Sequence, residues 1–448
     1  MSYDVVIVGA GFAGASAAYF LSNAGVKTLI IDVKGWDRVG DRPCGDAIGK
    51  HHFDELGLPY PKGHELEGYV KGIAIYSPSE SSSILVNGEG FEVHRIKYVQ
   101  RLLNEALGRG CEFLGNTHVR GPIVKDGYVV GVKLWSNGGA KEVYSKVVID
   151  SSGNARSVVR YLPRSWPVNE SLELRDANVA YREVRVLNHE IEEPEVLRIY
   201  VNNEISPGGY WWFFPYSLMR GYVNVGLGIR ADLRGLHPKD LLYKYVLSRP
   251  EFKGSRIVEA GGALVPTRRP ISSLVWNGIA VIGDAAYVVN PVHGGGKGSS
   301  MISAKCVAEA VVNALDNNDV SANGLWSANI CYMRRYGCKQ GALDIFRYFL
   351  QKLSNDDLEF SISKRLVSGD ELNEISLRGR FEVGLVDKVV RLASLLTRPS
   401  LLIKLRNVVR YMDLIKDHYM NYPSRPEGLN EWVRKLGELI NSYHGSLT

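Results

Sequence analysis

The segment SYDVVIVGAGFAGASAAYFL near the N-terminus constrains the fold of this 448-residue chain more than any other stretch. Its apolar run over residues 3–8 predicts a buried strand, and the pattern G-x-G-x-x-G follows at Gly9, Gly11 and Gly14. In a strand-turn-helix unit, the first glycine permits the tight turn and the second lets a pyrophosphate approach the backbone. The third lets helix and strand pack closely, and the helix N-terminus offers free amides to the phosphates. A glycine-rich turn without function is the alternative.

A second predicted strand, VKTLIID, ends in Asp32. A carboxylate at this place accepts hydrogen bonds from ribose hydroxyls, and it disfavours a 2′-phosphate. Strand, glycine turn, helix, second strand and terminal acid therefore predict a site for FAD or NAD. We also expect Ala13, Val33 and Val119 to contact this cofactor.

A second glycine-rich segment follows a predicted strand over residues 276–282. The strand ends in Gly283 and Asp284, and a long helical run begins after the cluster Gly294, Gly295, Gly296, Lys297 and Gly298. The free amides of a helix N-terminus suit an anion or a polar ring edge. A flexible loop is the alternative, but loops are rarely bounded by a clean strand and a clean helix.

Two further segments complete a pattern that resembles the FAD-dependent family typified by p-hydroxybenzoate hydroxylase. They are VIDSSGN over residues 148–154, which contains Gly153, and the helical run that opens at Arg95. The resemblance implies that Asp284 contacts the ribityl or pyrophosphate region of FAD and that Gly294 to Gly298 lie near the isoalloxazine ring. It also implies that Arg95 reaches the flavin side chain.

Two motifs resemble one branch of that family, the geranylgeranyl reductases, and most closely the archaeal enzymes that saturate the isoprenoid chains of membrane lipids. The first is Pro43-Cys44-Gly45, and the second is P-x-x-Y-x-W-x-F-P over residues 207–215. The resemblance implies FAD-dependent reduction of C=C bonds in geranylgeranyl lipids or geranylgeranyl diphosphate, by hydride from flavin N5 plus a proton. Cys44 and Gly45 are then expected beside the flavin.

The aromatic stretch YWWFF has two faces if it is a strand, because side chains alternate along strands. Tyr210, Trp212 and Phe214 share one face, and Trp211 and Phe213 share the other. We expect the first three to wall a slot for a polyprenyl chain and the other two to pack in the core. The flanking residues 207–209, Pro-Gly-Gly, indicate a sheet edge or a close backbone approach.

Three residues are candidates for the group that delivers the proton: Cys44, Tyr210 and His293. A general acid must lie within hydrogen-bond reach of the reacting atom or of a bridging water. Each has a structural alternative: a small buried thiol, a hydroxyl that caps a carbonyl and a loop histidine. Lys297 places positive charge near the flavin, or it is a solvated lysine.

The length predicts two or three domains. The fold class is α/β plus β: a Rossmann-type FAD-binding domain over 1–69, 92–160 and 271–320, an antiparallel-sheet substrate domain over 70–91 and 161–270, and a helical domain over 321–448. The basic amphipathic run at 386–418 is either a lid over the substrate or a helix that lies on an anionic membrane surface.

Composition and charge narrow the classes of binding partner that we expect. Hydrophobic residues make up 45% of the chain and the net charge is +6 without basic blocks, which disfavours nucleic acid. We find no secretory leader and no spanning apolar run, so we expect a cytoplasmic protein, with peripheral membrane contact as an option. A second G-x-G-x-x-G is absent, so the reductant is external, either NADPH or a ferredoxin-like protein.

Five cysteines without C-x-x-C spacing predict no metal site. A disulfide among Cys306, Cys331 and Cys338 is plausible only in an oxidising compartment or a hyperthermophile.

Two other functions remain open from sequence alone. One is a flavin monooxygenase or halogenase of the same fold, because halogenases carry a related aromatic strand. The other is a flavin-binding redox sensor that consumes no lipid.

Overall fold

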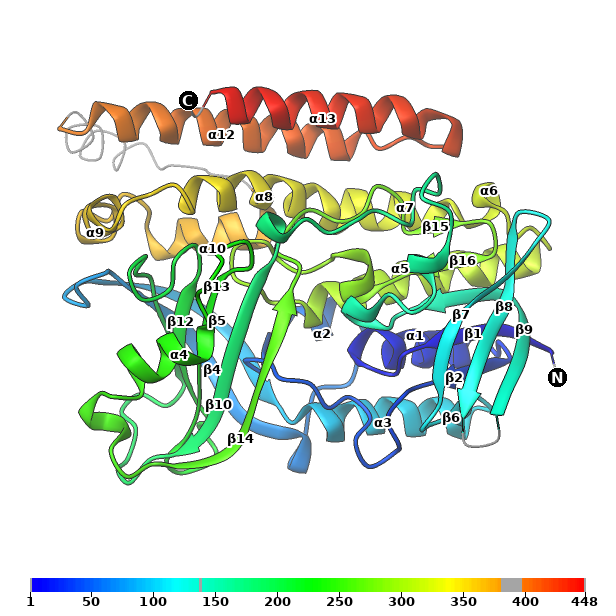
Figure 1. Cartoon of the computed structure of the whole chain (residues 1–448), viewed down its shortest axis with the longest axis horizontal. Coiled ribbons are helices and arrows are strands. Elements are labelled where there is room, and N and C mark those ends of the chain that lie inside the picture. The colour runs from blue at the N-terminus through cyan, green and yellow to red at the C-terminus, as the bar shows by residue number, and fades with distance from the viewer. Residues whose placement is uncertain (1, 137–138, 380–396, 447–448) are drawn as a thin grey trace.

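Two large sheets lie side by side in the computed structural model, with a layer of helices across both (Figure 1). The structure describes residues 2–136, 139–379 and 397–446. The first sheet consists of β1 (Ser2–Val8), β2 (Thr28–Ile31), β6 (Glu112–Leu114), β7 (His118–Lys125), β8 (Tyr128–Ser136), β9 (Gly139–Asp150), β15 (Val275–Trp276) and β16 (Ile279–Val281). Its order is β15-β16-β9-β1-β2-β6, and the antiparallel pair β8 and β7 extends from β9.

Strand β1 is central because residues 5–8 are apolar and buried. It runs parallel to β2 and β9, with Val8 opposite Ile31 and Asp150. The carboxyl ends of these strands therefore meet at one edge of the sheet, where α/β folds bind nucleotides. Three helices pack near this sheet, namely α1 (Phe12–Asn23), α3 (Arg95–Gly108) and α5 (Lys297–Asp316).

The predicted strand at 276–282 is wrong in one respect. The chain reverses at Asn277-Gly278, so that β15 and β16 form an antiparallel pair with Trp276 opposite Ile279. Gly278 has φ +69°, which the two-residue turn requires. An Asn-Gly pair is the strongest short-range signal for such a turn.

The second sheet is antiparallel except where β11 runs parallel to β4. Its order is β14-β10-β13-β12-β11-β4-β5-β3. The strands are β3 (Ala47–Gly49), β4 (Leu66–Tyr76), β5 (Ser83–Val93), β10 (Asn178–Val186), β11 (Val196–Tyr200), β12 (Tyr210–Pro215), β13 (Tyr222–Arg230) and β14 (Arg256–Val265). The N-terminal strands in this sheet thus span residues 47–93, beyond the predicted 70–91.

The aromatic strand β12 lies inside the sheet, between β11 and β13. The expectation of a sheet edge is therefore wrong, and the glycines serve a close backbone approach instead. A Cβ on Gly209 would lie 2.2 Å from the carbonyl oxygen of Gly228 on β13. Glycine is the residue that permits this contact.

Helices from residue 322 onward form the layer across the sheets (Figure 1). They are α6 (Ala322–Leu325), α7 (Ser327–Tyr332), α8 (Cys338–Leu350), α9 (Asn355–Ser363), α10 (Gly369–Arg378), α12 (Pro399–Met420) and α13 (Leu429–Gly445). Ser354 and Ser368 start α9 and α10 by accepting hydrogen bonds from backbone amides three residues later. Helix α12 packs on α8, and residues 386–396 of the predicted amphipathic run lie outside the described residues.

Cys306 of α5 and Cys331 of α7 form a disulfide, and Cys44, Cys111 and Cys338 are free. Within the described ranges, no helix combines the length and the apolar character that crossing a bilayer needs.

Candidate active site

One cavity of about 1330 Å³ joins the carboxyl edge of the first sheet to the aromatic face of β12. Every residue predicted from the sequence to contact cofactor or substrate lines this cavity, except Gly14. The structure thus gathers segments from residues 9 to 298 around one space. Which of these residues contact a ligand remains a prediction.

The turn after β1 has the backbone geometry that a pyrophosphate site needs. Gly9 has φ +97°, and a Cβ there would lie 2.6 Å from the carbonyl oxygen of Ser151. A Cβ on Gly14 would lie 1.9 Å from the carbonyl oxygen of Gly9, so this glycine serves helix-strand packing rather than the cavity. Gly11 has open space beside its Cα, and no side chain caps α1. The first amides of α1 are therefore left for a ligand.

Asp32 is held at the end of β2 by two backbone amides. Its carboxylate accepts hydrogen bonds from Ala10 N at 2.6 Å and Lys34 N at 2.8 Å. These bonds fix the carboxylate beside the glycine turn and leave it on the cavity wall, where it can also accept from a ribose.

The second glycine segment approaches the same cavity from the other side. Gly296 precedes α5 without a side-chain cap, and Asp284 pairs with Arg42 at 2.8 Å. Two helix N-termini with free amides, a carboxylate at the end of β2 and glycines that exclude side chains fit a dinucleotide such as FAD. Sequence reasoning missed Arg42, because its partner lies 242 positions away.

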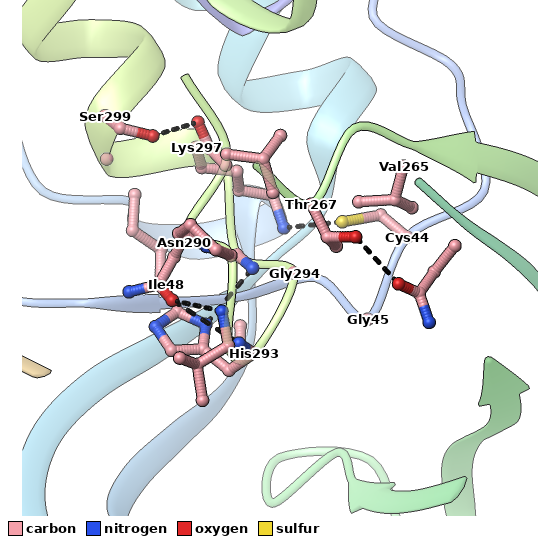
Figure 2. A pocket seen from close by; sticks show the side chains of 18 of the residues that line it. Cys44, Gly45, Ile48, Val265, Thr267, Asn290, His293, Gly294, Lys297 and Ser299 are labelled. Carbon is pink, nitrogen blue, oxygen red and sulfur yellow. Dashed lines mark hydrogen bonds between the residues drawn. The ribbon is translucent and has the colours of Figure 1, made fainter. Parts of the chain in front are cut away.

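Cys44 and Lys297 meet in this cavity (Figure 2). Lys297 Nζ lies 3.4 Å from Cys44 Sγ and 3.3 Å from Asp46 Oδ1. Asp46 adopts φ +61°, an uncommon backbone conformation for a residue other than glycine. This turn brings the thiol and the carboxylate to the same ammonium group.

Three cations approach the carboxylate of Asp46. Besides Lys297, Arg95 Nη1 lies 3.7 Å and Arg182 Nη2 lies 3.9 Å from the Asp46 carboxylate. Burial alone would raise the pKa of the Cys44 thiol, but Lys297 and Arg95 outweigh burial and lower that pKa. The arrangement therefore favours a more acidic thiol than a free cysteine has.

Tyr210 and His293, the other two candidates for the acid, are joined to each other. The Tyr210 hydroxyl donates to the carbonyl oxygen of His293 at 2.6 Å, and burial raises the pKa of Tyr210. Burial and then Lys339 lower the pKa of His293 to about 4. At neutral pH the imidazole is therefore neutral and the phenol is bound to a carbonyl, so neither is well suited to donate a proton.

The two faces of β12 differ as the alternation predicts. Trp212 and Phe214 line the cavity, and Trp212 Nε1 donates to Asn224 Oδ1 at 3.0 Å. Trp211 and Phe213 pack in a separate apolar cluster with β13. Trp211 stacks on Tyr200 with ring centroids 3.7 Å apart.

Apolar side chains continue the cavity beyond the aromatic wall. They come from β4, β5 and β11 of the second sheet and from α8, α9 and α10 of the helical layer. Examples from each element are Ile73, Ile84, Ile199, Phe346, Ile362 and Ile375. A periodic apolar pattern does not distinguish such a lining from an ordinary core, so the sequence did not reveal these residues.

Comparison with known proteins identifies the family. Residues 176–265 match the model of the geranylgeranyl reductase catalytic domain, and residues 4–59 match that of glucose inhibited division protein A. The whole chain is 48% identical over 452 residues to the digeranylgeranylglycerophospholipid reductase of Sulfolobus acidocaldarius, covering 100% of this chain and 99% of that protein. The chain belongs to the digeranylgeranylglycerophospholipid reductase family.

A more distant relative agrees, and a solved structure shares the fold. The digeranylgeranylglycerophospholipid reductase of Picrophilus torridus is 31% identical to this chain. The match covers 72% of this chain and 80% of the Picrophilus protein. A geranylgeranyl bacteriochlorophyll reductase-like structure from Thermoplasma acidophilum matches with a TM-score of 0.76 at 23% identity. The match covers 91% of this chain and 99% of the Thermoplasma chain. The predictions of this reductase family, of an FAD-dependent oxidoreductase and of the fold class are confirmed.

A triple mutant of the flavin-dependent brominase Bmp2 shares the fold at 19% identity, with a TM-score of 0.66, and the match covers 87% of this chain and 98% of the brominase. This likeness concerns the fold alone. The full-length match to a reductase outweighs it, and the halogenase alternative loses its support.

Proposed function

We propose that this protein reduces C=C bonds in the geranylgeranyl chains of a glycerophospholipid. One observation carries the proposal: an apolar, ring-walled space continues without a break into the glycine-lined dinucleotide cradle. Burial of each CH₂ group contributes about 0.8 kcal/mol, so this space favours a long hydrocarbon chain.

The residues that would hold FAD are Gly9, Gly11 and Asp32 at one end, and Asp284, Gly295 and Gly296 at the other. When bound, FAD supplies the hydride, and an external donor such as NADPH or a ferredoxin-like protein returns the electrons. The positive charges of Lys297, Arg95 and Arg182 stabilise negative charge that develops on reduction nearby.

Cys44 is our proposed proton donor. An isolated alkene is a poor hydride acceptor, so one carbon must receive a proton as hydride reaches the other. An acid works best when its pKa is close to the working pH. The pKa of Cys44 is lowered toward that range, whereas those of Tyr210 and His293 are shifted away from it. Trp212 and Phe214 give this part of the cavity an apolar wall, so we expect the thiol to meet the alkene away from bulk water.

We further propose that the protein works in the cytoplasm at the membrane surface, where its substrate lies. Helix α12 supports this contact, because Ile403 is 62% exposed and neighbours the basic residues Lys404 and Arg406.

The test uses purified holoprotein, reduced with dithionite under anaerobic conditions and given a geranylgeranyl glycerophospholipid. We expect lipid masses to rise in steps of two hydrogens. Reoxidation of the flavin without a change in the lipid would indicate a redox protein. Oxygen-dependent gain of a hydroxyl group or a halogen would indicate an oxygenase or halogenase.

A further inference from the structure

Asn224 is a fully buried asparagine in the interior of the second sheet. It lies on β13, between β10 and β12, and its exposure is 0%. It is paired across the ladder with Phe214, so its side chain lies on the same face as Trp212 and Phe214, the face that lines the cavity. Burial of an amide is costly unless the amide forms hydrogen bonds. Asn224 therefore needs partners within the protein.

The Asn224 amide uses its carbonyl oxygen and both of its N–H groups. Oδ1 accepts a hydrogen bond from Trp212 Nε1 at 3.0 Å. Nδ2 donates to the carbonyl oxygen of Cys44 at 2.7 Å and to the hydroxyl of Tyr216 at 3.4 Å. An indole N–H can only donate and a carbonyl oxygen can only accept, so these partners fix the orientation of the amide. One side chain thus joins the aromatic wall to a residue that lies 180 positions earlier in the chain.

The residues on either side of Cys44 fit against the same sheet by shape. A Cβ on Gly261 of β14 would lie 2.4 Å from Pro43 Cγ. A Cβ on Gly45 would lie 3.0 Å from Phe214 Cε2. These apolar contacts bring the loop close to the sheet but do not orient its peptide groups. The hydrogen bond from the asparagine does, because hydrogen bonds are directional.

Asn224 stands behind the cavity wall rather than in it. Cys44, Gly45 and Trp212 line the cavity, and Asn224 is not among the described residues that do. A residue in this position does not touch a ligand, but it sets the distance between the thiol and the aromatic wall. A misplacement of about 1 Å can cost on the order of a hundredfold in rate.

We propose that Asn224 is a positioning residue for proton transfer, which fixes the Cys44 loop to Trp212 and so holds the thiol beside the slot for the alkene. The proposal rests on the proposed function, in which Cys44 donates the proton and Trp212 walls the slot. A general acid must stay within reach of the reacting atom. The thiol also lies 3.4 Å from Lys297 Nζ, and a displaced loop would lose this contact as well.

Asn329 of α7 provides a matched control for a purely structural role. Its exposure is also 0%. Its Oδ1 accepts from Leu274 N at 2.7 Å, and its Nδ2 donates to Ser273 Oγ at 2.8 Å. Asn329 is likewise not one of the described residues along the cavity. Asn329→Leu therefore removes a comparable set of buried hydrogen bonds at a place that does not contact Cys44.

The first test compares lipid reduction by FAD-loaded full chains of wild type, Asn224→Leu and Asn329→Leu. Both variants should melt at a lower temperature, because each leaves buried polar groups without partners. We expect kcat of Asn224→Leu to fall by about a hundredfold with an unchanged KM, because the side chain does not touch the substrate. Asn329→Leu should keep both constants. A loss of kcat in Asn224→Leu no greater than that in Asn329→Leu would overturn the proposal.

The second test needs no turnover. Cys44 is alkylated with iodoacetamide over a range of pH, and the product is measured by mass spectrometry. In Asn224→Leu the profile should move toward higher pH, because the thiol leaves the ammonium group of Lys297, which favours its thiolate. Asn329→Leu should keep the wild-type profile. The same profile in Asn224→Leu and wild type would show that the amide does not position the thiol.

Asn224→Asp keeps the test decisive if leucine prevents folding. The side chain has nearly the same size, and burial favours the protonated carboxyl group, which has one O–H donor and one acceptor. It can therefore keep the bonds to Trp212 and Cys44 and lose only the bond to Tyr216. We expect turnover at pH 5 within about tenfold of wild type. A hundredfold loss with FAD still bound would contradict positioning by these two hydrogen bonds.

The two tests also separate this proposal from the proposed function. If the wild type reduces no lipid, the proposed function fails. The alkylation profiles still decide whether Asn224 holds the Cys44 thiol in place.

Discussion

Cys44 and Lys297 lie 253 positions apart in the chain, yet their side chains meet. The contact depends on two local conditions. Asp46 turns the cysteine loop through a left-handed conformation, and Gly296 and Gly298 keep side chains away from the start of α5. A charged group in a partly buried site changes the protonation of its neighbour far more than it would in water. The properties of the thiol therefore depend on Lys297.

Replacement of Lys297 by Met should make Cys44 less reactive. Lys297 lowers the pKa of the thiol, so its loss raises that pKa and reduces the thiolate fraction at neutral pH. Alkylation of Cys44 by iodoacetamide, followed by mass spectrometry against pH, should show a profile displaced toward higher pH.

Cys111 serves as an internal control, because burial raises its pKa and Lys297 does not act on it. An unchanged alkylation profile for Cys44 would show that the ammonium group does not tune the thiol.

The β1–α1 turn shows, at the scale of an element, how two glycines in one motif have different tasks. Gly14→Ala should destabilise the fold by about 1–3 kcal/mol, because its Cβ would collide with backbone at Gly9.

Gly11→Ala should fold normally, since its φ of −74° suits alanine and its Cβ meets nothing within 4 Å. That Cβ would occupy the approach to the proposed phosphate site, so FAD should be lost. Chemical denaturation and flavin absorbance separate the two effects. Equal flavin content in Gly11→Ala and wild type would contradict this site.

Strand β12 allows a second matched pair. Trp211→Ala should cost about 3–5 kcal/mol of unfolding free energy, because Trp211 is 1% exposed and stacks on Tyr200. Trp212→Ala should leave flavin bound and lower lipid turnover by on the order of a hundredfold, because the alkene loses its positioning wall. Loss of flavin from Trp212→Ala would instead show that this face supports the fold.

Sequence patterns predicted these elements well where the signal is local. The glycine motif, Asp32 and the two faces of β12 follow from spacing over a few residues, and all lie where the pattern places them. The sequence could not reveal the pairing of Arg42 with Asp284 or the cations around Asp46. Each of these depends on segments that only tertiary folding brings together. The interior position of β12 was missed for the same reason. The flanking glycines indicate that another backbone segment comes close, but they do not indicate which strand it is.

The whole molecule is cross-linked once, between α5 and α7. The disulfide joins residues 25 positions apart, so its reduction should lower stability by about 3 kcal/mol through the larger entropy of the unfolded chain. Thermal denaturation with and without reductant should show a lower melting temperature in the reduced protein. Cys338→Ala, which removes a free thiol, should keep the response to reductant. A melting temperature that does not respond would show that the disulfide is absent in solution.

The cavity wall formed by both the second sheet and the helical layer has a consequence for how a long substrate behaves. Its lining from β4, β5, β11 and α8–α10 is largely apolar, and apolar contacts have no preferred register along a polyprenyl tail. Displacing the tail by one five-carbon unit exchanges each contact for an equivalent one, so the free energy is nearly the same at every offset. A single fixed reaction centre can therefore meet successive alkenes as the lipid slides, without a separate recognition site for each.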